Sequence, residues 1–252
     1  GAYGRVNGIV GNSWRDNLAG RTVYCVADTT TTIIGGEGQG RSPANLQTLT
    51  FGDQLRISTG FQGKVISLSN KDRAAILLGG KYANAALWMR DSAFVTSSYY
   101  GTDLPAWVRR FNASGIVNGY FGRVWKRSLP LSAFRTMDKD DAPYEDGGNG
   151  MGTTFPHRIT GTDTTRRTPS YYSALLASPY GSEALAGLAV HQRVVNLAVD
   201  RESMAGEALD DVELPKWLRE VHRIGVQARH EFAEFSLATR VRQCRTSDVI
   251  LE

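Results

Sequence analysis

Residues Lys64 to Gly80 read KVISLSNKDRAAILLGG, and the architecture of the chain can be worked out from them. They begin with a short apolar run that includes Val65 and Ile66, the composition of a buried strand. A polar turn, Asn70 to Arg73, separates this run from a second apolar one that ends on two glycines. In an open α/β sheet, ligands bind beyond the carboxyl ends of the strands, where this turn would lie. The segment therefore predicts an α/β fold with a candidate ligand-binding turn.

The turn carries two cations, Lys71 and Arg73, which lie two positions apart. In an extended turn both side chains can point to the same side. Lysine supplies a compact charge and arginine a planar fork of donors, a combination suited to phosphate oxygens. Charged turns are common on protein surfaces, so a solvated loop is the better explanation of this turn taken alone. The rest of the sequence has to decide between the two interpretations.

The composition is that of an ordinary globular chain. Of the 252 residues, 41% are hydrophobic and 21% are charged, which excludes an intrinsically disordered protein. The net charge of +4 permits an anionic ligand, but no dense basic stripe accompanies it, so nucleic acid is not expected as a partner. No apolar run approaches the length of a membrane span. Because the sequence begins at Gly1 without a methionine or a signal peptide, we expect a removed N-terminal segment or a piece of a longer chain.

The two cysteines, Cys25 and Cys244, lie far apart in the sequence and outside any metal-ligand spacing. A disulfide between them is possible, but nothing in the sequence supports one. Two isolated thiols therefore leave the redox compartment undecided.

Local patterns predict further elements in the first half of the chain. Arg21 to Asp28 is a strand candidate, and Asp28 to Ala44, rich in threonine and glycine, is expected to be a surface loop. Pro43 to Thr59 has the spacing of a helix with its proline in the first turn. Trp88 to Tyr100 indicates a hairpin that turns at Arg90-Asp91-Ser92, and Asp103 to Asn112 a short helix.

The second half of the chain is predicted to be mainly helical. Asn118 to Ala142 mixes aromatic and basic residues at irregular spacing, which favours a packed subdomain over a nucleic-acid surface. Leu185 to Val199 has a helical pattern, and the clearest helical periodicity runs from Leu214 to Phe235.

Several short motifs, taken together, resemble one known family. In chain order they are GIVGNSW, VYCVAD, GRSPANL, VISLSNKDRAAIL, ANAALW, YYGTDLPAWVRRFN, TFPH and SPYG, and they span roughly residues 8–187. Each motif alone is weak, but their shared order is specific. They resemble the alkaline phosphatase superfamily, and most closely the PafA-type bacterial alkaline phosphatases of its monoesterase branch.

The resemblance implies a doubly wound α/β sheet with a capping insertion, here only partly present. It also implies a phosphate ester substrate, two zinc ions, a threonine or serine nucleophile, and a covalent phosphoenzyme that metal-activated water hydrolyses. Asn12 matches the family's phosphate-contacting asparagine, and Lys71 and Arg73 match its Lys-x-Arg pair, which grips the phosphoryl group. This match favours phosphate binding as the role of the turn. Members of the family are typically periplasmic or secreted.

The sequence also departs from the family pattern. The family's nucleophile and first metal-binding aspartate precede the GIVGN segment and would therefore lie before Gly1. The remaining zinc ligands should be an Asp-x-x-x-His pair, an Asp-His pair and a later histidine. None of the four histidines fits this pattern; they are His157, His191, His222 and His230. We therefore expect neither a nucleophile nor zinc ligands in this chain.

These observations predict a central phosphatase fragment that keeps the phosphate-binding residues and is inactive alone. Residues 1–189 would form the partial α/β domain, with the cap insertion around 83–170, and residues 190–252 a helical, arginine-rich tail of foreign or frame-shifted origin. Two other hypotheses remain open. The chain could be a non-catalytic anion-binding module that uses Asn12, Lys71 and Arg73, or an interaction protein that packs the Leu214 to Phe235 helix on a partner, although such apolar stripes are more often core.

Overall fold

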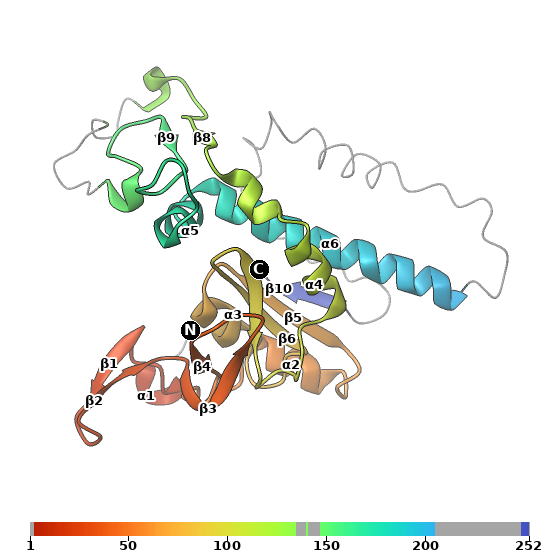
Figure 1. The fold of residues 1–252 in the computed structure, drawn as a ribbon. Helices are drawn as coiled ribbons and strands as arrows, with labels where there is room; N and C mark the ends of the chain where they lie inside the picture. The colour runs from red at the N-terminus through yellow and green to blue at the C-terminus, as the bar shows by residue number, and fades with distance from the viewer. Residues whose placement is uncertain (1–2, 135–139, 141–146, 205–247, 252) are drawn as a thin grey trace.

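The computed structural model describes residues 3–134, 140, 147–204 and 248–251 (Figure 1). Its centre is a six-stranded mixed sheet in the order β10-β5-β6-β7-β3-β4. The pairs β10–β5 and β5–β6 are parallel, and the other three pairs are antiparallel. The strands are β3 (Ala27–Ile34), β4 (Gln39–Arg41), β5 (Lys64–Ser69), β6 (Ala85–Arg90), β7 (Ala93–Ser97) and β10 (Asp248–Leu251).

Helices lie on both sides of this sheet, and two small hairpin-like sheets flank it (Figure 1). The α-helices are α1 (Gly4–Asn7), α2 (Phe51–Ser58), α3 (Asp72–Gly79), α4 (Ala106–Ala113), α5 (Pro169–Leu176) and α6 (Pro179–Met204). The small sheets pair β1 (Ser13–Asp16) with β2 (Arg21–Tyr24) and β8 (Val124–Trp125) with β9 (His157–Arg158). Short 3-10 helices are η1 (Ile116–Tyr120), η2 (Leu131–Phe134) and η3 (Gly148–Gly150).

Alternation along the central strands produces a hydrophobic core on each face of the sheet. On β6, Leu87 belongs to the cluster under α4 and α6, whereas its neighbour Trp88 belongs to the cluster under α3. On β7, Phe94 and Val95 are divided in the same way. Successive side chains of a strand point to opposite faces, so a sheet with two buried faces reads as a nearly continuous apolar run. This arrangement confirms the predicted α/β class.

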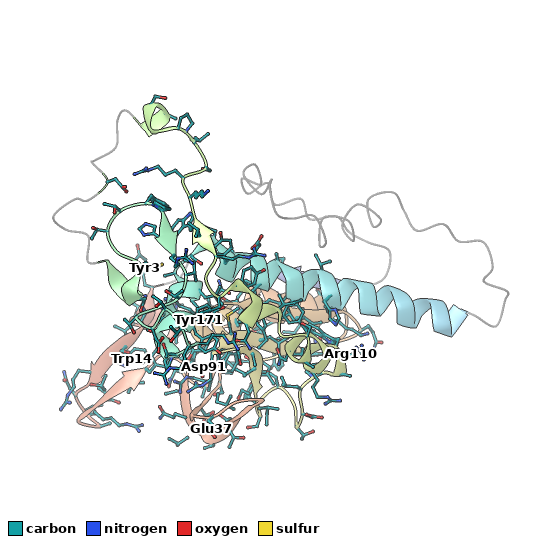
Figure 2. All side chains as sticks on the ribbon, turned by 45° about the horizontal axis from the view of Figure 1, so that its top comes forward. Tyr3, Trp14, Glu37, Asp91, Arg110 and Tyr171 are labelled. Carbon is teal, nitrogen blue, oxygen red and sulfur yellow. The ribbon has the colours of Figure 1, made fainter. Side chains whose placement is uncertain are left out.

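Side chains from the C-terminal half complete the core under α4 and α6. Tyr171 of α5 is fully buried, and its hydroxyl donates to the Val117 carbonyl at 2.6 Å. Figure 2 shows Tyr171 within densely packed side chains, whereas Glu37 lies at the periphery. Tyr120 is buried in the same cluster, and Phe121 and Trp125 pack against it. The aromatic residues of this region therefore serve packing, as the irregular spacing predicts.

Several predicted elements are confirmed. The first apolar run of the Lys64 to Gly80 segment is β5, and the second forms α3. The predicted hairpin is β6–β7, with Asp91 at a φ of 50° in its turn. The helix predicted from Asp103 to Asn112 is α4, which begins at Ala106, just after Pro105, and ends at Ala113.

The predicted surface loop from Asp28 to Ala44 is wrong, because β3 and β4 occupy most of it. The threonines of this stretch are β-branched and suit a strand. Gly40 lets β4 approach β3 closely, since a Cβ at this position would collide with the backbone carbonyls of Thr31 and Asp28. Local composition favours a loop here, but pairing between the two strands decides the structure.

The helix predicted from Pro43 to Thr59 is shorter, since α2 begins only at Phe51. Thr50 is the N-cap, and its side chain and that of Asp53 form a reciprocal capping box. The residues between Pro43 and Thr50 are not helical, and the Asn45 side chain donates to the Cys25 carbonyl at 3.2 Å.

Other predictions concern residues that the structure does not describe. The Leu214 to Phe235 helix and Cys244 lie outside the described ranges, so the proposed interaction surface and the possible disulfide are not tested. Cys25 is buried and has no disulfide partner among the described residues. Helix α6 runs continuously through the predicted domain boundary after residue 189. None of the helices in the described ranges combines the length and apolar character that crossing a bilayer requires.

Replacing Asp28 with asparagine should reduce the loss of stability in acid. The Asp28 carboxylate accepts hydrogen bonds from the side chains of Ser42 and Thr30, which lower its pKa from the ordinary 3.8. A carboxylate whose pKa is lowered by folding stabilises the fold at pH values above its pKa in the unfolded chain. This contribution disappears as the pH falls through the lowered pKa of the folded chain. We expect Asp28→Asn to cost about 1 kcal/mol at pH 7 and less below pH 3.8 in urea unfolding. An equal cost at pH 7 and pH 2 would contradict this assignment.

Candidate functional site

The candidate site is the turn between β5 and α3. Strand β5 ends at Ser69, helix α3 begins at Asp72, and Lys71 is the helix N-cap in an extended conformation. Since β5 is paired on both sides with parallel strands, the turn lies at the carboxyl end of an interior strand of the sheet. The Lys71 side chain is exposed, while Arg73 is half-buried in the first turn of α3. The two predicted cations thus share a helix N-terminus, where backbone amides favour anions.

Between the two cations, Asp72 is fully engaged by other residues. Its Oδ1 accepts from the Tyr24 hydroxyl at 2.6 Å, and its Oδ2 from Nε of Arg41 at 2.7 Å. The Arg41 and Asp72 side chains are only 16% and 17% exposed. The Arg41 guanidinium also lies over the Tyr24 ring, 5.0 Å from its centroid. This ion pair is therefore well shielded from solvent.

Tyr24 also joins the Asp72 carboxylate to Arg73. Nη1 of Arg73 donates to the Tyr24 hydroxyl at 3.4 Å. Burial is the main cause that raises the pKa of Tyr24, and its hydrogen bond to Asp72 raises it further. The hydrogen bond to Tyr24 raises the pKa of Arg73. Arg73 therefore remains charged next to a neutral phenol.

Asn12 approaches this cluster through its backbone. Its carbonyl accepts from the Cys25 amide at 3.0 Å, and Cys25 directly follows Tyr24. The Asn12 side chain is exposed. The structure thus places all three predicted residues around the end of β2 and the start of α3.

A second helix begins beside the turn. Gly181, in the first turn of α6, packs against Asn70: a Cβ at position 181 would stand 3.4 Å from Nδ2 of Asn70. Oδ1 of Asn70 is buried and has no hydrogen-bond partner within the part of the chain that the structure describes. The N-termini of α3 and α6 therefore both lie next to residues 70–73.

The sequence patterns did not indicate Tyr24, Arg41 and Asp72 as parts of this cluster. Tyr24 and Asp72 are 48 positions apart, and Arg41 and Asp72 are 31 positions apart. Tyr24 and Arg41 do occur within two of the family-like motifs, VYCVAD and GRSPANL, and this was the one available signal.

The described residues offer no zinc site. No group of three or more histidine, cysteine, aspartate or glutamate side chains is arranged to hold a metal ion in these ranges. His157 packs against Trp125 and Phe155, and its Nδ1 lies 3.0 Å from the Met151 carbonyl oxygen. His191 packs against Phe111, and burial lowers its pKa. Both histidines are thus part of the packing, and His222 and His230 lie outside the described ranges.

Several known proteins are similar to this chain in sequence or structure. No family model matches the chain. Alkaline phosphatase PhoV of Synechococcus elongatus is 42% identical over 162 residues, which are 62% of this chain and 30% of PhoV. Alkaline phosphatase PafA of Elizabethkingia meningoseptica is 31% identical over 218 residues, 84% of this chain and 38% of PafA. The crystal structure of wild-type PafA superimposes with a TM-score of 0.67 at 30% identity, covering 77% of this chain and 38% of that one. The chain is therefore PafA-like over part of the length of these alkaline phosphatases.

The superfamily match is partial. The chain spans between 30% and 38% of the length of these two curated relatives. A second PafA structure, with a TM-score of 0.65, is that of a mutant with one threonine, one asparagine, one lysine and one arginine replaced, the last two separated by a single position. This chain has an asparagine and a Lys-x-Arg pair in the same order, at Asn12, Lys71 and Arg73.

Proposed function

We propose that this chain supplies the phosphate-binding part of a PafA-like phosphate monoester hydrolase. Asn12, Lys71 and Arg73 would contact the phosphoryl group. The observation that carries the proposal is the placement of both cations at the N-terminus of α3, beyond the carboxyl end of β5. Within the described ranges, no carboxylate forms an ion pair with either cation. The order of the residues replaced in the PafA mutant supports the same three positions.

The chemical role of these residues would be electrostatic. Phosphoryl transfer spreads negative charge over the equatorial oxygens, and fixed donors stabilise that charge most where they need not reorganise. The Arg73 guanidinium offers a planar fork of donors, Lys71 a point charge, and the first amides of α3 further donors. The Asn12 amide would add a neutral hydrogen bond.

Other parts of the proposed mechanism would come from outside the described residues. In the two-zinc, covalent phosphoenzyme mechanism that the family resemblance implies, zinc would activate water and neutralise the attacking and leaving oxygens. The described residues would bind and orient the ester. We accordingly propose a central fragment that is inactive alone, belonging to a phosphatase that acts in the periplasm or outside the cell.

Replacing either cation should weaken phosphate binding. We expect Lys71→Ala and Arg73→Ala each to raise the Kd for inorganic phosphate at least about tenfold in isothermal titration calorimetry, because each removes a charge-assisted contact. Arg109→Ala is the matched control, since Arg109 of α4 is a half-exposed cation that pairs with Asp103, which precedes the helix. Equal affinities in all four proteins would contradict the proposed binding site.

An assay with p-nitrophenyl phosphate and added zinc tests whether the chain is inactive alone. Phosphate binding without turnover fits the inactive fragment and equally the non-catalytic anion-binding module. Zinc-dependent turnover by the purified chain, with zinc found in elemental analysis, would overturn the proposed inactivity. It would assign the metal ligands to residues outside the described ranges.

A further inference from the structure

We infer that Tyr24, Asp72 and Arg41 are positioning residues that hold Arg73 ready for an anion and prevent its neutralisation. This inference rests on the proposed phosphate-binding function of Arg73. None of the three residues needs to touch the phosphate. Their role would be to fix the direction and the free charge of the guanidinium that does.

The direction of the hydrogen bonds follows from the donors and acceptors present. The Tyr24 hydroxyl has one proton, and Asp72, as a carboxylate, can only accept it; this bond is the short one, at 2.6 Å. The remaining lone pairs of the hydroxyl oxygen can therefore accept from Nη1 of Arg73, at 3.4 Å. Arg73 is thus oriented by a neutral oxygen and forms no ion pair with a carboxylate within the described ranges.

Arg41 explains why Asp72 does not neutralise its neighbour. Nε of Arg41 holds Oδ2 of Asp72, while Nη1 of Arg41 donates to the carbonyls of Gln39 and Gly40, each at 3.0 Å. The Arg41 backbone is held as well, because its carbonyl accepts from the Ser97 hydroxyl. An arginine fixed in this way occupies one carboxylate oxygen, and the Tyr24 hydroxyl and the Arg73 backbone amide occupy the other. Asp72 is then unable to form a bidentate pair with Arg73.

The consequence is a defined effect of removing the Tyr24 hydroxyl. In Tyr24→Phe, Oδ1 of Asp72 loses the Tyr24 hydroxyl and keeps only the Arg73 backbone amide as a donor, at 2.7 Å, and the Arg73 side chain loses the acceptor that orients it. Arg73 is then free to turn toward the carboxylate and pair with it, which competes with phosphate. We expect the Kd for inorganic phosphate to rise about fivefold.

A double-mutant cycle on the full chain tests this role, with inorganic phosphate as the probe in calorimetry. The fivefold effect of Tyr24→Phe should vanish in an Arg73→Ala background and persist in a Lys71→Ala background. Tyr99→Phe is the control, because it removes an exposed hydroxyl that donates to the Lys81 carbonyl. A purely structural role of Tyr24 would give the same effect in both backgrounds and would overturn the inference.

Two further measurements cover the other outcomes. Arg41→Lys should also weaken phosphate binding only when Arg73 is present, because lysine keeps the charge but lacks the separate Nε and Nη1 donors that hold Asp72 and the two carbonyls. The guanidinium NMR signal of Arg73, assigned by its absence in Arg73→Ala, should shift in Tyr24→Phe, because its acceptor changes from the Tyr24 hydroxyl to the Asp72 carboxylate. An unchanged signal would overturn the inference even if no phosphate binds.

If Arg73→Ala lowers the affinity for phosphate but Tyr24→Phe does not, this inference fails while the proposed function stands. If Arg73→Ala has no effect, the proposed function itself fails.

Discussion

Phe94→Ala is expected to lower the free energy of unfolding by about 3–5 kcal/mol. Phe94 lies on β7, is 0% exposed, and packs edge-on against Phe111 of α4 with ring centroids 5.8 Å apart. Its amide donates to Oδ1 of Asn112 at 2.9 Å, and its carbonyl accepts from Nδ2 of the same residue at 2.8 Å. Because these bonds hold the strand against α4, the structure has little freedom to close the cavity that the missing ring would leave.

Urea unfolding followed by far-UV circular dichroism measures this loss. The control is Phe51→Ala, which truncates the same type of side chain where it is 64% exposed on α2. The control should change the free energy of unfolding by less than about 0.5 kcal/mol. Similar losses for both variants would mean that Phe94 is not in the core.

Gly80→Ala should also destabilise the chain strongly, by about 3 kcal/mol. Gly80 follows α3 with a φ of 78° and a ψ of −153°, a conformation that is nearly exclusive to glycine. A Cβ at this position would collide with Oδ2 of Asp53 and Oγ1 of Thr50, the two side chains of the α2 capping box. Asp53 is fully buried and also accepts from the Tyr82 amide at 2.7 Å, so it cannot move away without losing that bond. Backbone strain and the broken cap therefore add to each other.

The two contributions can be separated experimentally. Gly60 also has a positive φ, 59°, but a Cβ there would meet no atom within 4 Å. Gly60→Ala should therefore report backbone strain alone, about 1 kcal/mol in urea unfolding. If Gly80→Ala costs no more than Gly60→Ala, the contact between Gly80 and the capping box has no energetic importance.

Local sequence patterns were enough to predict the strand, turn and helix around the candidate site. The β-branched run after Lys64 forms β5, the polar residues 70–73 form the turn, and the apolar run that follows forms α3. Each depends on neighbours within a few positions, so periodicity and turn chemistry suffice. The same holds for the hairpin at Asp91. The ordered family-like motifs also made the superfamily recognisable from the sequence.

Local sequence patterns gave wrong predictions where contacts with other segments determine the backbone structure. The threonine- and glycine-rich stretch from Asp28 to Ala44 has no local preference strong enough to indicate strands. Pairing between β3 and β4, and the closeness that Gly40 permits, determine its structure. Likewise, α2 begins where Thr50 and Asp53 form a cap, which shortens the helix that apolar spacing predicts.

The sequence by itself determined the α/β class, the strand–turn–helix that carries Lys71 and Arg73, and the family. Only the tertiary structure decided the surroundings of Arg73. Tyr24, Arg41 and Asp72 come from β2, β4 and α3, and they meet because both strands end next to the start of that helix. Hydrogen bonds between residues 31 and 48 positions apart leave no periodic trace in the sequence, because packing, and not local conformation, selects the partners.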